Sequence, residues 1–233
     1  MLESKDHQQI FNAGGASDLT FALGNRSGGV ANVKSARPLL YYIRHGETEW
    51  NALGRLQGTQ DVPINERGRA QAAQAAGILS ELLLRDGRDK RSIPFVASPL
   101  GRARKTMELV RGTLHLPPNT YAIDDRLSEI GYGEWEGLTL VEAEARDAAL
   151  YAVRLADKWT VAVPGGESYA QVQVRVSAWY SELATDTIAV AHGGTARALM
   201  VALGFETPQS AADLFVAQGA VYVFAEGGLT KYR

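Results

Sequence analysis

The stretch Leu39-Leu40-Tyr41-Tyr42-Ile43-Arg44-His45-Gly46-Glu47 joins an apolar run directly to two basic side chains and a glycine. Residues 39–43 are continuous in large apolar, aromatic and β-branched groups, which is typical of a strand covered on both faces. In open α/β sheets, ligands bind at the carboxyl ends of the strands. The stretch therefore predicts a buried strand that delivers Arg44 and His45 to a ligand site.

A second histidine and a second arginine occupy comparable positions. His192-Gly193-Gly194 follows the apolar run Thr187–Ala191, and Arg102 lies in the first turn of the helix expected after the strand at Phe95–Ala97. The guanidinium fork of arginine matches phosphate oxygens, and a helix N-terminus adds backbone N–H donors. Since all these groups follow strand ends, the pattern predicts that they converge on a cradle for a phosphate-like anion.

Strands and helices alternate along the rest of the chain. Asn65 suits the N-cap of a long helix, and Ser98-Pro99 suits the start of another. Alternation of this kind predicts an α/β fold, a three-layer sandwich whose mostly parallel central sheet is flanked by helices on both faces. The expected strands are 39–43, 93–97, 120–123, 187–191 and 221–224, and the expected helices are 65–86, 98–112, 140–153, 167–184 and 193–203.

Length and composition narrow the class of protein. The 233 residues fit one large domain, and the net charge of -2 argues against a dedicated nucleic-acid binder. The lack of cysteine excludes disulfides and thiol nucleophiles. No apolar stretch is long enough for a membrane helix and no secretory pattern begins the chain, so we expect a cytoplasmic protein. Residues 1–37 are rich in small and polar groups and predict a flexible tail before a domain at 38–233.

The proton donor that such chemistry needs is less clear from the residues alone. Several carboxylates follow the expected strand 120–123, and their spacing does not choose among them. The same stretch lacks the alternating Asp/Asn and terminal Glu of a calcium loop, so no metal is expected. The carboxylates concerned are Asp124, Asp125, Glu129, Glu134 and Glu136.

Taken in chain order, the motifs resemble those of the histidine phosphatase superfamily, also called phosphoglycerate-mutase-like. The resemblance spans about residues 39–225 and implies the fold of that family. Its motifs are Arg44-His45-Gly46-Glu47-Thr48-Glu49-Trp50-Asn51, Gly54-Arg55-Leu56-Gln57-Gly58, Ser98-Pro99-Leu100-Gly101-Arg102-Ala103, Leu127-Ser128-Glu129, Pro164-Gly165-Gly166-Glu167-Ser168 and His192-Gly193-Gly194.

The resemblance implies a role for each matching position. His45 is implied to be the nucleophile that forms a phosphohistidine, and Glu129 to protonate the leaving oxygen and then help to activate water. It also implies that no metal or other cofactor is needed, and we expect His192 to act in its protonated form. Arg44, Arg102 and His192 are implied to hold the phosphoryl oxygens, Asn51 and the backbone at Gly193 to add donors, and Gln57 and Gly58 to line the mouth of the pocket.

The same site serves phosphatases and mutases of this family. The mutases typically carry serine at the position of Thr48 and asparagine-serine at Gly194-Thr195, with a longer, arginine-bearing insertion over the site. Here the corresponding cap, around residues 137–163, is short. We therefore expect a metal-independent phosphatase that hydrolyses phosphomonoesters of small metabolites through His45.

Three alternatives stay open: a cofactor-dependent phosphoglycerate mutase, a catalytically idle relative that binds phosphate, and a protein-phosphohistidine phosphatase, whose members tend to be shorter. Leucine and alanine dominate residues 138–155, with Trp159 close by. This composition predicts a partly apolar cap and favours a leaving group that is not a sugar. The sequence does not name the substrate, which we expect to be a small phosphorylated molecule. The oligomeric state is also open, with a homodimer among the options.

Overall fold

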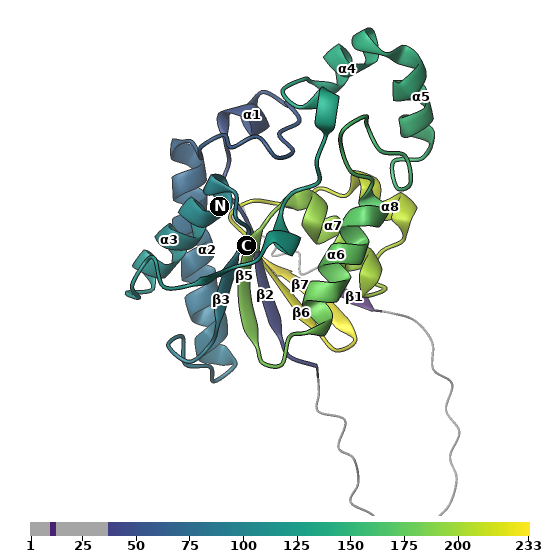
Figure 1. The fold of residues 1–233 in the computed structure, drawn as a ribbon. Helices are drawn as coiled ribbons and strands as arrows, with labels where there is room; N and C mark the ends of the chain where they lie inside the picture. Colours follow the sequence, from purple (N-terminus) through teal and green to yellow (C-terminus); the bar gives the residue numbers. More distant parts are fainter. Residues whose placement is uncertain (1–9, 13–36) are drawn as a thin grey trace, which may run out of the picture.

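The computed structural model describes residues 10–12 and 37–233, which form a mixed α/β fold around one seven-stranded sheet (Figure 1). The strand order is β1-β7-β6-β2-β5-β3-β4. The strands are β1 (Ile10–Asn12), β2 (Leu40–Arg44), β3 (Phe95–Ala97), β4 (Ala122–Ile123), β5 (Thr187–Ala191), β6 (Val221–Ala225) and β7 (Gly228–Tyr232).

The parallel part of the sheet positions the motifs. β2, β5, β3 and β4 run parallel, with Arg44 paired in register to Ala191 and Ala97 to Val190. The carboxyl ends of β2, β5 and β3 therefore lie side by side, as the sequence predicts. On the other side of β2, the strands β6, β7 and β1 continue the sheet through antiparallel pairs.

Two of these strands were not predicted. β7 forms a hairpin with β6. Leu229 is the one buried residue of β7, so this segment lacks the apolar alternation that predicts a strand. β1 falls inside the predicted tail and pairs with β7 at the edge of the sheet. The remainder of that tail, residues 1–9 and 13–36, lies outside the described residues.

Helices cover both faces of the sheet, and the side chains of β2 alternate between them. Tyr41 and Ile43 pack with α2 (Glu66–Arg85) and α3 (Gly101–Thr113), whereas Leu40 and Tyr42 pack with α6 (Tyr169–Ser181) and α7 (Gly193–Ala202). This is the three-layer arrangement expected for a strand buried on both faces. Truncating a wholly buried side chain in either layer to alanine costs about 2–5 kcal/mol.

Short elements lie beyond the carboxyl ends of the parallel strands (Figure 1). The single helix predicted at 140–153 is instead two helices, because the Asp147 carboxylate accepts a hydrogen bond from Leu150 N and starts a new helix there. No helix in the described part of the chain is long and apolar enough to cross a membrane. The short elements are α1 (Glu49–Ala52), the 3-10 turns Asp125–Leu127 and Gly133–Trp135, α4 (Leu140–Arg146), α5 (Ala148–Ala156) and α8 (Pro208–Asp213).

Candidate active site

His45 follows β2 directly and is only 1 % exposed. Its Nδ1 lies 2.8 Å from the carbonyl oxygen of Gly46, so Nδ1 carries the proton and donates it, which leaves the lone pair on Nε2. Burial lowers the pKa of His45 well below its ordinary value, and the charges of Arg44 and Arg102 lower it further. The imidazole is therefore neutral, as a nucleophilic histidine has to be.

The turn after His45 requires glycine. A Cβ on Gly46 would lie 2.2 Å from the carbonyl oxygen of Gly68, near the start of α2. This close approach of two backbone segments allows Gly46 N to donate to Thr106 Oγ1, at 3.0 Å, and holds the carbonyl that orients His45. The glycine of the motif thus fixes the position of the histidine before it.

Arg44, at the end of β2, and Arg102, in the first turn of α3, both line the cavity that contains His45. Arg102 is fully buried and donates from its two terminal nitrogens to the carbonyl oxygens of Gln60, at 2.6 Å, and Gly58, at 2.7 Å. Arg44 donates to the carbonyl of Val216 at 2.7 Å. The Nε of each arginine is buried without a partner among the described residues. Buried N–H groups of this kind call for an acceptor, which an anion would supply.

His192 lies next to His45, with ring centroids 5.1 Å apart. Its Nε2 is 2.7 Å from Ser98 Oγ, and its Nδ1 is buried without a partner among the described residues. Burial lowers the pKa of His192 well below its ordinary value, and the nearby Arg102, His45 and Arg44 lower it further. The imidazole is therefore neutral in this arrangement, whereas the sequence analysis expects it to be protonated.

The contact with His192 also corrects the predicted role of Ser98. Helix α3 begins at Gly101, and its N-cap residue Leu100 makes no side-chain cap. Ser98 is three residues before the helix, and its hydroxyl accepts from Leu100 N at 3.3 Å while facing His192. The signal Ser-Pro is ambiguous in sequence, because it suits a helix start and a turn equally well.

Glu129 sits at the N-terminus of α7, beside His192. Its Oε2 accepts from Gly194 N at 3.2 Å, and its Oε1 accepts from Thr195 N at 3.3 Å and from Ile130 N at 3.0 Å. A Cβ on Gly194 would lie 2.4 Å from Glu129 Oε1, so this position of Glu129 depends on glycine.

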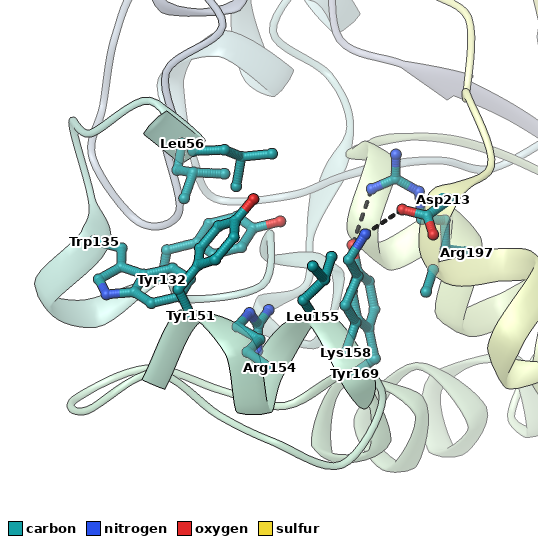
Figure 2. A pocket seen from close by; sticks show the side chains of 12 residues that line it. Leu56, Tyr132, Trp135, Tyr151, Arg154, Leu155, Lys158, Tyr169, Arg197 and Asp213 are labelled. Carbon is teal, nitrogen blue, oxygen red and sulfur yellow. Dashed lines mark hydrogen bonds and ion pairs between the residues drawn. The ribbon is translucent and has the colours of Figure 1, made fainter. Parts of the chain in front are cut away.

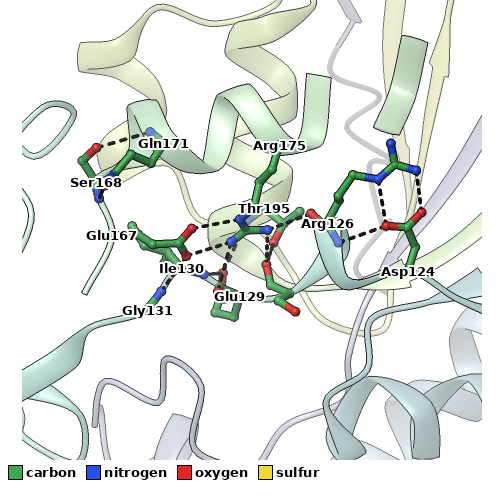
Figure 3. A network of polar contacts seen from close by, with 11 residues as sticks. Asp124, Arg126, Glu129, Ile130, Gly131, Glu167, Ser168, Gln171, Arg175 and Thr195 are labelled. Carbon is green, nitrogen blue, oxygen red and sulfur yellow. Dashed lines mark hydrogen bonds and ion pairs between the residues drawn. The ribbon is translucent and has the colours of Figure 1, made fainter. Parts of the chain in front are cut away.

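A single arginine of α6 holds the segment that carries Glu129 (Figure 3). Arg175 donates to the carbonyl oxygens of Arg126 and Ser128, each at 2.7 Å, and of Glu129, at 3.1 Å. The same guanidinium forms a bidentate pair with Glu167, with both bonds at 3.0 Å. Glu167 Oε2 in turn accepts from Gly131 N at 3.1 Å. The turn 126–131 is therefore fastened at four backbone groups by one half-buried ion pair.

The other carboxylates that the sequence left open are engaged elsewhere or lie away from the site. Asp124 pairs with Arg126, Glu134 pairs with Arg146, and Glu136 accepts from Thr59 N at 2.8 Å. Only Glu129 among these carboxylates lines the cavity that contains His45.

The cavity at the strand ends has a volume of about 130 Å³. It brings together most of the residues singled out in the sequence: Arg44, His45, Asn51, Gln57, Gly58, Arg102, Glu129 and Gly193, with His192 packed against His45. Asn51 Oδ1 accepts from Thr48 N and from Gln218 Nε2, so its amide nitrogen is the end left to donate.

Sequence reasoning missed four residues of the lining. Arg197 lies on α7 one turn after Gly193, and this helical spacing was the signal available for it. Tyr132 lies three residues after Glu129, but no motif or spacing in the sequence identifies it as a residue of the cavity. The four residues are Arg55, Leu56, Tyr132 and Arg197.

A second cavity, of about 290 Å³, opens between the core and α5 (Figure 2). It shares Leu56, Tyr132 and Arg197 with the first cavity, so the two cavities are adjacent. Among the described residues, no group of three or more histidine, cysteine, aspartate or glutamate side chains is placed to hold a metal ion.

Comparison with known proteins decides the family. The model of the histidine phosphatase superfamily (branch 1) matches residues 40–228. The chain belongs to the histidine phosphatase superfamily. The matched range includes every element that lines the first cavity, from β2 to α7. The expectation drawn from the motifs is confirmed.

Similar members of the superfamily include both phosphatases and mutases. The glucosyl-3-phosphoglycerate phosphatase of Mycolicibacterium vanbaalenii is 35% identical over 178 residues, covering 70% of this chain and 73% of that one. The 2,3-bisphosphoglycerate-dependent phosphoglycerate mutase 2 of Gloeobacter violaceus is 31% identical over 185 residues, covering 73% and 78%. Among solved structures, the native mycobacterial glucosyl-3-phosphoglycerate phosphatase superposes with a TM-score of 0.66 at 30% identity, covering 81% of this chain and 89% of that one.

Proposed function

We propose that this histidine phosphatase hydrolyses phosphomonoesters of small metabolites without a metal, through a phosphohistidine on His45. The observation that carries the proposal is the orientation of His45. Its Nδ1 is committed to the Gly46 carbonyl, and its Nε2 stands in a cavity with the guanidinium groups of Arg44 and Arg102. These cations supply the positive charge that magnesium supplies at other phosphoryl-transfer sites.

In the first step, His45 Nε2 attacks phosphorus and the bond from phosphorus to the alcohol oxygen breaks. Glu129 gives a proton to that oxygen, so a neutral alcohol leaves. In the second step, Glu129 takes a proton from water, whose oxygen attacks the phosphohistidine, and the nitrogen–phosphorus bond breaks. Inorganic phosphate leaves, and His45 and Glu129 return to their starting forms.

The protonation of His192 is coupled to the binding of substrate. Its unpartnered Nδ1 is buried beside the cradle, and its low pKa results from burial and from the neighbouring cations. A bound phosphate dianion would offset the charges of Arg44 and Arg102 and would therefore raise the pKa of His192. We therefore infer that substrate brings a proton onto His192, which then stabilises the phosphoryl oxygens as a third cation.

Hydrolysis is favoured over mutase chemistry by the packing at Gly194. The mutase pattern carries asparagine there, and even a Cβ would lie 2.4 Å from Glu129 Oε1. Glu129 therefore takes a position in this chain that such a residue would prevent. The mutase alternative still has its own test, which is conversion of 3-phosphoglycerate to 2-phosphoglycerate in the presence of 2,3-bisphosphoglycerate.

The deciding assay uses purified full-length protein, a chelator and 4-nitrophenyl phosphate. We expect hydrolysis with an acid-labile phosphoenzyme, and a loss of about a thousandfold or more in His45→Ala. His115→Asn is the matched control, because His115 lies outside the cavity and asparagine tolerates its φ of 57°. Hydrolysis that survives His45→Ala rejects the proposal. Phosphate binding without turnover would instead support the idle relative.

A further inference from the structure

The cavity next to the phosphate cradle has a composition that selects the alcohol part of the substrate. It is more than twice the size of the cradle, about 290 Å³ against 130 Å³, and lies directly next to it, with Leu56, Tyr132 and Arg197 in the walls of both. Most of its wall is aromatic or aliphatic, and Figure 2 shows these side chains facing a common space. They are Leu56, Tyr132, Trp135, Leu140, Tyr151, Leu155 and Tyr169.

The charges in this wall are not balanced. Lys158 pairs with Asp213, so these two side chains cancel. Arg154, on α5, is only 6 % exposed and has no carboxylate partner among the described residues. It donates to the carbonyl of Val161 and lies over the rings of Tyr132, at 5.7 Å, and Trp135, at 6.0 Å.

Arg197 is the other cation of the wall, and it belongs to both cavities. It donates to the carbonyl of Leu214 at 2.8 Å and to Tyr169 Oη at 2.9 Å, and it also lines the cradle. Arg197 has no carboxylate partner among the described residues, so its positive charge can act on a phosphoryl group held in the cradle. This leaves Arg154 as the one guanidinium in the outer cavity that is neither paired nor shared with the cradle, within the residues described.

We infer that the substrate is a phosphate ester of an apolar-bodied hydroxy acid, whose body lies against the aromatic wall and whose single carboxylate pairs with Arg154. A buried guanidinium without a counter-charge is costly, and one carboxylate repays that cost. The aromatic faces favour a flat ring or a branched aliphatic body over a sugar. This inference rests on the proposed function, because it treats the outer cavity as the place of the leaving alcohol.

The test compares two aryl phosphates of equal size that differ in charge, 4-carboxyphenyl phosphate and 4-carbamoylphenyl phosphate. We expect kcat/KM to favour the carboxylate by about tenfold or more in the wild type, and Arg154→Met to abolish that preference. Using the ratio within each variant cancels the different electronic effects of the two substituents. Arg146→Met is the matched control, because Arg146 is an exposed cap arginine that pairs with Glu134 and does not line the cavity.

A binding measurement separates this inference from the proposed function. Calorimetry with the product alcohol 4-hydroxybenzoate, against its neutral counterpart 4-hydroxybenzamide, needs no turnover. Preferential binding of the acid that is lost in Arg154→Met supports the inference even if neither ester is hydrolysed, a result that would reject only the phosphatase proposal. Equal binding of acid and amide, or a preference that persists in Arg154→Met, overturns the inference while leaving hydrolysis intact.

Discussion

Replacing Arg175 by methionine tests whether the half-buried pair of Arg175 and Glu167 places Glu129. Methionine keeps much of the apolar stem and removes the five hydrogen bonds to three carbonyl groups and the Glu167 carboxylate. The two side chains are 19 % and 31 % exposed, so the loss falls below the 3–5 kcal/mol of a fully buried pair, and we expect about 2–3 kcal/mol. For a chain of this size, that corresponds to a fall in Tm of about 8 °C.

The effect on catalysis should depend on the leaving group. An alkoxide needs the proton from Glu129, whereas 4-nitrophenolate leaves without it. General-acid catalysis contributes about 10²–10⁴-fold, and a small misplacement forfeits a large part of that. We therefore expect Arg175→Met to lower kcat/KM about 30-fold for an alkyl phosphate, and less than threefold for 4-nitrophenyl phosphate.

The comparison should be made well below the Tm of the variant. Arg126→Met is the matched control, because Arg126 is a neighbouring arginine that also forms ion pairs, with Asp124 and Glu182, but whose side chain is a third exposed and donates to no carbonyl of the turn 126–131. Arg175→Lys should recover part of the alkyl-phosphate rate, since an ammonium restores the charge but not the fork. An equal fall on both substrates would show that Arg175 only stabilises the fold, and would refute its role in placing Glu129.

Three further predictions concern the residues around the cradle. The pKa values of His45 and His192 are low in the folded protein, so the unfolded chain takes up protons first as the pH falls below about 6.5, and the free energy of unfolding decreases there. His192→Gln should reduce the dependence of this free energy on pH by about 1.4 kcal/mol per pH unit, measured by chemical denaturation between pH 4 and 6. An unchanged pH dependence would contradict a neutral His192 in the folded protein. Gly194→Ala should lower alkyl-phosphate hydrolysis at least about tenfold, because the new Cβ would lie 2.4 Å from Glu129 Oε1, and it should lower the Tm less than Gly46→Ala, because the groups it meets are side-chain ends, Glu129 Oε1 and Ile130 Cγ2, rather than backbone; wild-type rates would show that Glu129 acts from another position. Gly46→Ala should destabilise the fold by about 3 kcal/mol in thermal unfolding, since its Cβ would lie 2.2 Å from a backbone oxygen, and a shift under about 1 kcal/mol would mean that the two segments separate easily.

The central elements could be predicted from sequence because their signals are local. β5 occupies Thr187–Ala191 as expected, since four consecutive apolar residues after Thr187 are typical of a strand in the middle of a sheet, and all five positions are buried. α2 begins after the N-cap Asn65, whose side chain accepts from Gly68 N at 2.8 Å. β7 was missed because one buried side chain, Leu229, gives no period to detect.

The cap was predicted less well for a related reason. Residues 140–153 have helical composition throughout, and a single aspartate that captures a backbone N–H is enough to divide them. The burial of Arg154 was equally hidden, because an arginine on an amphipathic helix is normally solvated. Its contacts with Tyr132 and Trp135 depend on how the cap packs on the turn 132–135, which no local pattern records.

The motif His192-Gly193-Gly194 shows what the sequence could and could not reveal about the chemistry. Its histidine was visible as a candidate at once, whereas the two glycines carry information that depends on distant segments. A Cβ on Gly193 would lie 3.4 Å from Arg44 Nε, and one on Gly194 would meet Glu129. Gly194 thus leaves room for Glu129, whereas a Cβ on Gly193 would make only an ordinary contact with Arg44. Glu129 could not be chosen by spacing alone because its selection depends on backbone N–H groups of α7, more than sixty residues later in the chain. A histidine in this motif is therefore better evaluated together with the space that its glycines keep free than as a single side chain.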